Sequence, residues 1–100
     1  MALSVETKKI QEEILHQMDA ARWKGFHLQQ GQLILTETYL VFRSVSNTVV
    51  ISRNDIVKAR HIGFLNLIKN GFAVLMKTHD SYRFLVQDKR FWMDLLNAKT

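Results

Sequence analysis

The sequence predicts a mainly β domain: an antiparallel sheet bent into a barrel and capped by a C-terminal helix, with an extra helix before it. Three observations predict this class. Apolar and polar residues alternate with a period of two from Trp23 to Gln87, short polar or glycine-containing breaks divide that region, and a helical period appears only at the two ends of the chain. Since strands and helices do not alternate, a parallel α/β fold is disfavoured.

The composition is that of an ordinary globular domain. The chain has 100 residues, of which 47% are hydrophobic and 23% charged, and these values fit one domain with one core. It has no cysteine, so we expect no disulfide and no thiolate site. Acidic residues interrupt the first twenty positions, and no apolar run approaches the ~18 residues of a membrane-spanning helix. We therefore expect a cytoplasmic protein, with peripheral association at a membrane left open.

The extra N-terminal helix is predicted over residues 4–21. Its apolar side chains recur every fourth residue, which is typical of one helix face. An amphipathic helix needs cover, from the body of the domain, a second copy of the chain or a membrane surface. We expect residues 1–22 to form this helix and residues 23–100 the barrel, within a single domain. The apolar face of the helix consists of Ile10, Ile14 and Met18.

The barrel is expected to contain seven short strands, in which alternate residues share a face. They are predicted at residues 23–31, 33–35, 39–43, 48–53, 56–62, 71–76 and 82–87. Asp88 is a suitable N-cap for a closing helix over 89–98, whose apolar residues are placed to plug one end of the curled sheet. Trp23 and Trp92 are both expected in the core, because tryptophan buries a large apolar area.

Several motifs in this region resemble those of a known family. The stretch GQLILT at residues 31–36, followed by LVF at 40–42, resembles the G-x-L-x-L-T-x-x-x-L-x-F core of GRAM-type and bacterial pleckstrin-homology-like domains. Further segments resemble the family's later elements in the expected order. They are VISRNDI at 50–56, GFAV at 71–74, YRF at 82–84 and DKRFW at 88–92. The resemblance covers about residues 24–98.

The resemblance implies a seven-stranded bent barrel, no enzymatic activity and no cofactor. Related modules bind phosphoinositides, other proteins or both. Lipid-binding members carry a cluster of lysines and arginines in the loop between the first two strands. We place that loop at residues 27–32, which contain neither residue type, and this speaks against inositol-phosphate binding at the usual site. The N-terminal helix lies outside the family pattern.

Two candidate binding surfaces follow from the residues. Lys58 and Arg60 share a face of the fifth predicted strand, and arginine can hold a phosphate with two hydrogen bonds. Other cations join them if the third, fourth and fifth strands are neighbours. The net charge of +5 fits an anionic partner, although a charge of this size is also ordinary for the solubility of a small domain. The candidate anion or lipid site consists of Lys58, Arg60, Lys69, Arg43 and Arg53.

The second surface is apolar. The predicted loop 63–69 carries four large apolar residues, which need cover from the barrel, a protein partner or a membrane. Together with the helix face, it suggests a protein-protein contact or a homodimer as the leading function. Binding of anionic lipid headgroups is the alternative. The candidate protein-contact residues are Ile10, Ile14, Met18, Phe64 and Leu65.

Other functions are not indicated. No serine lies in a nucleophile elbow and no glycine-rich phosphate loop is present, so we expect no enzyme and no catalytic residues. The four histidines lack metal-ligand spacing, which predicts no metal site. The aromatic residues fall on predicted core faces rather than on an open stacking surface, and we therefore expect no nucleic-acid partner.

Overall fold

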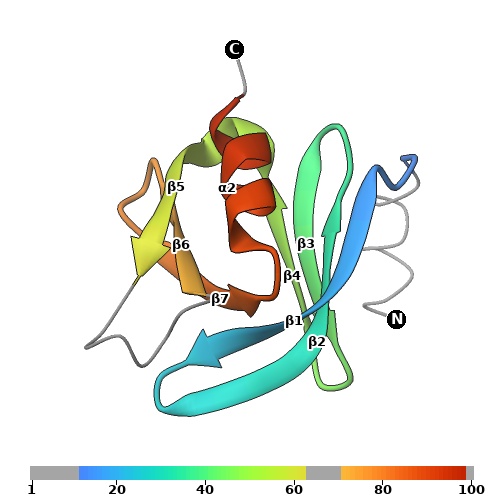
Figure 1. Cartoon of the computed structure of the whole chain (residues 1–100), viewed down its shortest axis with the longest axis vertical. Coiled ribbons are helices and arrows are strands. Elements are labelled where there is room, and N and C mark those ends of the chain that lie inside the picture. The colour runs from blue at the N-terminus through green and yellow to red at the C-terminus, as the bar shows by residue number, and fades with distance from the viewer. Residues whose placement is uncertain (1–11, 63–70, 99–100) are drawn as a thin grey trace.

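A computed structural model describes residues 12–62 and 71–98. It confirms the predicted fold class: one antiparallel seven-stranded sheet curls into a half-barrel, and helix α2 (Lys89–Asn97) lies across its open end (Figure 1). The strands occur in the order β4-β3-β2-β1-β7-β6-β5. Their bounds are β1 His16–Lys24, β2 His27–Leu35, β3 Tyr39–Ser44, β4 Thr48–Ser52, β5 Ile56–Ile62, β6 Gly71–Met76 and β7 Ser81–Val86, with a short 3-10 helix η1 at Arg53–Asp55.

Strand β1 holds the two halves of the sheet together. It pairs with β2 along its whole length and with β7 between Ala20 and Trp23. Strands β4 and β5 follow each other in the chain, yet they lie at opposite edges of the sheet, because η1 turns the chain from one half to the other. The curl brings both halves around one core.

The core lies on the inner face of the curl and is aromatic at its centre. The Phe84 ring lies between the rings of Phe42 and Phe72, with centroid distances of 5.7 and 5.8 Å. Trp92 and Leu96 of α2 are buried against the same cluster and fill its open end. A Cβ atom on Gly31 of β2 would come within 2.8 Å of the Phe42 ring and closer still to the Arg43 carbonyl oxygen, so this position requires glycine.

The N-terminal helix predicted over 4–21 is wrong for residues 12–21, because 12–15 are not helical and 16–21 belong to β1. A spacing of four residues is even, so it fits a strand of period two as well as a helix of period 3.6. Met18 and Ala20 face the core while Gln17 and Asp19 lie on the other face. The barrel therefore begins at His16 rather than at residue 23, and residues 4–11 of the predicted helix lie outside the described residues.

The first two predicted strands are also misplaced. Gly25 and Phe26, expected inside a strand over 23–31, form the turn between β1 and β2. Gly25 has a φ of +62°, the left-handed conformation that tight two-residue hairpin turns need at their first central position. Residues 27–35 are then one strand rather than parts of two. The predicted number of seven strands still agrees with the structure. Most of β1 was predicted as helix, and β2 was divided between two predicted strands, so the two errors cancel.

Candidate functional site

The β1–β2 hairpin is longer than the strands beside it. Its pairing with β3 ends at Gly31 opposite Ser44, and its pairing with β7 ends at Trp23 opposite Arg83. The last residues of the hairpin therefore extend past β3 and lie beyond the paired part of β7. Figure 1 shows this hairpin at the bottom of the view, while the C-terminal end of α2 lies toward the top.

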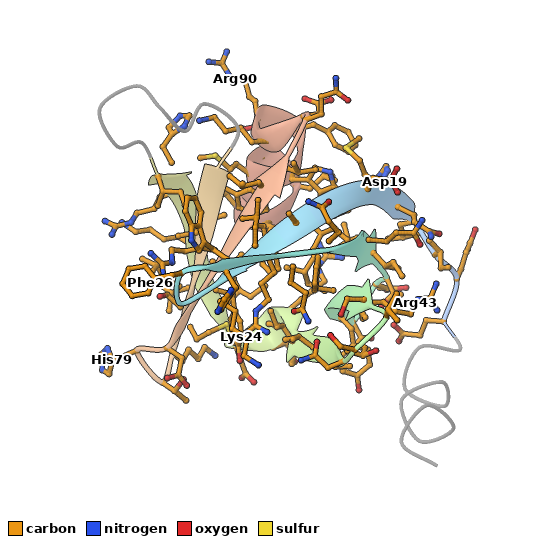
Figure 2. The ribbon with its side chains drawn as sticks, turned by 90° about the horizontal axis from the view of Figure 1, so that it is seen from below. Asp19, Lys24, Phe26, Arg43, His79 and Arg90 are labelled. Atoms are coloured by element: carbon orange, nitrogen blue, oxygen red, sulfur yellow. The ribbon has the colours of Figure 1, made fainter. Side chains whose placement is uncertain are left out.

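The tip of this hairpin exposes an aromatic residue between two basic side chains. Phe26 has a relative exposure of 102%, and Leu28 one of 47%. Lys24 and His27, on either side of the turn, are also exposed. Figure 2 shows Lys24, Phe26 and His79, the last from the β6–β7 turn, at one end of the molecule, and Arg43 and Arg90 well away from it. The tip thus joins apolar surface and positive charge.

A row of side chains on the outer face connects the tip to the basic residues of β5. The strand pairing aligns Arg60 with Ala73, Ala73 with Arg83, and Arg83 with Trp23. Neighbouring strands lie about 4.8 Å apart, so Arg60 and Arg83 are separated by about 10 Å, a span that two arginine side chains can close around one phosphate. We call Lys58, Arg60 and Arg83, all exposed, the basic patch.

The basic patch contains part of the predicted anion site. Lys58 and Arg60 share the outer face of β5 as predicted, because the β-bulge between Ile56 and Lys58 precedes both residues. Arg83 was missed as a site residue. Its face was clear from the alternation in the sequence, but only the order of β1, β7, β6 and β5 shows that it lies between Trp23 and Arg60.

Arg43 and Arg53 do not join the patch, because β4 and β5 are not neighbours. The two are also apart from each other: Arg43 pairs with Thr48, whereas the Arg53 N–H donates to the Thr38 carbonyl, about 16 Å further along the strand. The Arg53 guanidinium donates to the carbonyls of Thr36 and Glu37 at 2.9 and 3.2 Å. Arg53 therefore holds the β2–β3 turn, and Lys69 lies outside the described residues.

The predicted protein-contact residues do not form one face in the described part of the chain. Met18 packs against the core from β1, while Ile14, in the segment before β1, is 46% exposed. Ile10, Phe64 and Leu65 lie outside the described residues. The tryptophans also differ from each other. Trp92 is buried, but Trp23 lies on the outer face, only partly covered, next to Arg83.

An acidic residue anchors the start of the barrel. The Glu12 carboxylate accepts hydrogen bonds from the Thr38 hydroxyl, from the Thr36 hydroxyl at 2.8 Å and from the Thr38 N–H at 3.0 Å. These bonds, the Thr38 hydroxyl first, hold the pKa of the Glu12 carboxyl below its ordinary value. Glu12 thus ties the segment before β1 to the β2–β3 turn and is a structural residue.

Two kinds of feature are absent from the described residues. They contain no cluster of three or more histidine, cysteine, aspartate or glutamate side chains that could hold a metal ion. They also contain no helix long and apolar enough to cross a lipid bilayer. What the site offers is positive charge beside exposed apolar groups.

Comparison with known proteins places the fold. No protein-family model and no curated protein sequence matches the chain. Among solved structures, the C-terminal domain of an unknown protein from Leishmania infantum is 19% identical, with a TM-score of 0.79 over 96% of this chain and 94% of that one. The Slm1 PH domain, solved in complex with phosphoserine, is 12% identical, with a TM-score of 0.69 over 84% and 92% of the two chains.

A third similar structure belongs to a larger protein. The DH/PH fragment of PDZRHOGEF, in complex with human RhoA, is 17% identical, with a TM-score of 0.71 over 96% of this chain but 32% of that one. At these identities the likeness concerns the fold. The chain has a PH-like fold, as the sequence motifs suggested, whereas the GRAM assignment stays a prediction.

Proposed function

We propose that this chain is a non-catalytic binding module that docks reversibly on anionic membrane surfaces through the hairpin tip and the basic patch. The fully exposed Phe26 carries the proposal, because it projects at the end of a hairpin between Lys24 and His27. An aromatic side chain placed in this way is suited to enter the boundary between headgroups and acyl chains, where basic side chains meet anionic lipids.

The expected strength is modest. Burying one phenylalanine contributes about 1.5–3 kcal/mol, and each lysine or arginine near an anionic surface adds about 1 kcal/mol. Arg83 pairs with Trp23, three residues from Phe26, so it lies about 10 Å behind the tip, within roughly one Debye length of a membrane that the tip enters. The insertion of one phenylalanine and the attraction of a few basic side chains are each weak, and their combination favours reversible binding.

The objection from the sequence concerned a different segment. The loop without lysine or arginine was placed at residues 27–32, but the turn between the first two strands is Gly25-Phe26. Lys24 ends β1 and His27 begins β2, so a lysine lies directly beside this turn. The lack of cations within 27–32 therefore no longer argues against an anionic ligand at this end.

The protein-contact hypothesis has less support from the described residues. It required a helix over 4–21 and the loop at 63–69. Part of that helix is β1, and Met18 belongs to the core. The rest of this hypothesis, including Ile10, Phe64 and Leu65, stays a prediction.

The test is co-sedimentation with vesicles of phosphatidylcholine alone or mixed with phosphatidylserine, at low salt and at about 0.15 M salt. We expect binding only to the mixed vesicles and weaker binding at the higher salt. Phe26→Ser should lower the partition coefficient about tenfold or more, and Arg83→Gln about fivefold. Arg43→Gln and Arg90→Gln remove the same charge far from the tip and should change it less than twofold.

Two outcomes would contradict the proposal. One is no binding to the mixed vesicles at low salt by the folded wild-type protein. The other is an equal loss of binding in Arg43→Gln and Arg83→Gln, because net charge rather than this surface would then govern the interaction.

A further inference from the structure

The two edge strands of the sheet, β4 and β5, differ in how their outward N–H and C=O groups are protected from pairing with another strand. At the β5 edge, the Asn97 side-chain oxygen accepts from the Ala59 N–H at 2.8 Å, and the Asn97 amide nitrogen donates to the Ala59 carbonyl at 2.9 Å. A β-bulge and the charged Lys58 and Arg60 lie on the same strand. Bulges, charges and covering groups are the devices by which natural sheets prevent edge pairing.

Strand β4, at the opposite edge, has none of these devices among the residues that the structure describes. Its sequence, Thr-Val-Val-Ile-Ser from Thr48 to Ser52, carries no charge and no proline, and its pairing with β3 runs without a bulge. β4 ends the strand order, so no described strand lies beyond it. An uncharged strand of β-branched residues at an edge is a template for pairing with another strand.

The hydrogen bonds at the two ends of the β3–β4 ladder show which groups face the free edge. The Ser44 N–H donates to the Asn47 carbonyl, and the Arg53 N–H donates to the Thr38 carbonyl. In an antiparallel pair, bonded and non-bonded positions alternate. The odd-numbered residues of β4 therefore bond to β3. Thr48, Val50 and Ser52 direct their N–H and C=O groups toward the free edge.

We infer that β4 pairs with β4 of a second copy of this chain, antiparallel and across a two-fold axis at Val50. In this register Val50 lies opposite Val50 of the second copy, and Thr48 lies opposite Ser52 of the second copy. Each such pair exchanges two hydrogen bonds, so every outward N–H and C=O of both strands finds a partner. The cross-strand side chains match in size and polarity, and no like charges meet within the paired strands.

A second copy fits this edge better than an unrelated peptide for two reasons. The strand is its own complement in this one register, which an isologous dimer requires. The dimer would also close, because the only edge it leaves on each copy within the described sheet is the β5 edge, which Asn97, the bulge and the charges protect. Pairing should therefore stop at two copies, without growth into a filament.

The first test uses the absence of cysteine from the chain. In a bonded antiparallel pair the two Cα atoms lie about 5.5 Å apart, within the range that a disulfide spans. We expect Val50→Cys to form a covalent dimer under mild oxidation. Val57→Cys, an equally simple change at the β5 edge, should remain a monomer on a non-reducing gel. Equal cross-linking of both variants would overturn the proposal.

The second test is the mass in solution, measured by light scattering across a range of protein concentrations. The wild type should approach the mass of two copies. Val50→Lys, which sets two charges opposite each other, should have the mass of one copy, and Val57→Lys should keep the mass of two. A folded Val50→Lys that stays dimeric, or a wild type that is monomeric at its highest soluble concentration, would overturn the proposal.

Since Val50→Lys could also disturb folding, Thr48→Lys repeats the experiment at another outward position of β4, with circular dichroism to check the fold. This proposal does not rest on membrane binding. Both tests are made without lipid, so either proposal can fail while the other holds.

Discussion

The two ends of the molecule use aromatic residues in opposite ways. At the end capped by α2, Trp92 is fully buried, and the His16 ring meets the Phe91 ring edge-on at 4.9 Å. At the hairpin end, Phe26 touches little of the protein and is fully exposed. The difference shows that the position of an aromatic residue, rather than its type, decides whether it stabilises the fold or remains available for a partner.

The largest expected effect separates these two roles. Trp92→Ala should lower the free energy of unfolding by about 3–5 kcal/mol, because it leaves a cavity under α2. Phe26→Ala should change it by less than about 0.5 kcal/mol, because nothing packs on that side chain. Urea unfolding followed by circular dichroism measures both. If the two variants unfold at similar urea concentrations, the proposed difference between a stabilising Trp92 and an unpacked Phe26 is wrong.

A further variant sharpens this result. The Trp92 indole N–H is buried and has no hydrogen-bond partner among the described residues. Trp92→Phe removes that unsatisfied donor while keeping most of the ring volume, so it should cost clearly less than Trp92→Ala. A Phe variant as unstable as the Ala variant would mean that the indole's shape, and not buried apolar volume, holds α2 in place.

A smaller effect is expected from the contact between α2 and the sheet edge. Asn97→Ala leaves the Ala59 N–H and C=O without their side-chain partners and should cost about 1 kcal/mol. Hydrogen exchange at the Ala59 amide should become faster at the same time. Asn97→Asp keeps an acceptor for that N–H, so it should protect the amide better than Asn97→Ala. An unchanged exchange rate of the Ala59 amide in both variants would contradict the role of the Asn97 side chain in protecting this edge.

The smallest effect concerns Glu12, which is bonded to the β2–β3 turn. Its pKa is lowered in the folded state by the threonine hydrogen bonds. The stabilisation is therefore fully present above the unfolded pKa of about 4.3 and is lost as the pH falls through the lower folded value. Glu12→Gln should unfold at a lower temperature than the wild type at pH 7, and the difference should shrink at pH 3. Glu13→Gln, the same change at the neighbouring exposed position, is the control and should unfold close to the wild-type temperature at pH 7.

The sequence predicted the barrel well where strands are short and their alternation is strict. The third to seventh strands were recognised because residues such as Leu40 and Phe42, or Val74 and Met76, mark one face. The N-terminal strand was missed because Ile14 and Met18 are four residues apart, a spacing that a helix and a strand share. No local feature of the sequence distinguishes a helix from a strand here, and pairing with β2 is what makes this segment a strand.

The candidate site could be predicted only in part, for a related reason. Lys58 and Arg60 were found because they are neighbours on one strand. Arg83 lies near them only because β1, β7, β6 and β5 are consecutive in the sheet. Arg43 and Arg53 lie elsewhere, because β4 and β5 are at opposite edges. Such placements depend on contacts between distant parts of the chain. The hairpin tip was missed for a simpler reason, since Gly25 was assigned to a strand interior instead of a turn.

The double pairing of β1 has a consequence for how the chain folds. Strands β1 to β4 pair with their neighbours in sequence, and so do β5 to β7, so each half can form from nearby residues. Within the described sheet, the halves are joined by the β1–β7 ladder, in which Ala20 meets Val86, 66 residues further along the chain. Such long-range closure is slow, because loop entropy is lost before the contacts form. Completion of the β1–β7 ladder is thus expected to set the folding rate, and until then both β1 and β7 present open edges.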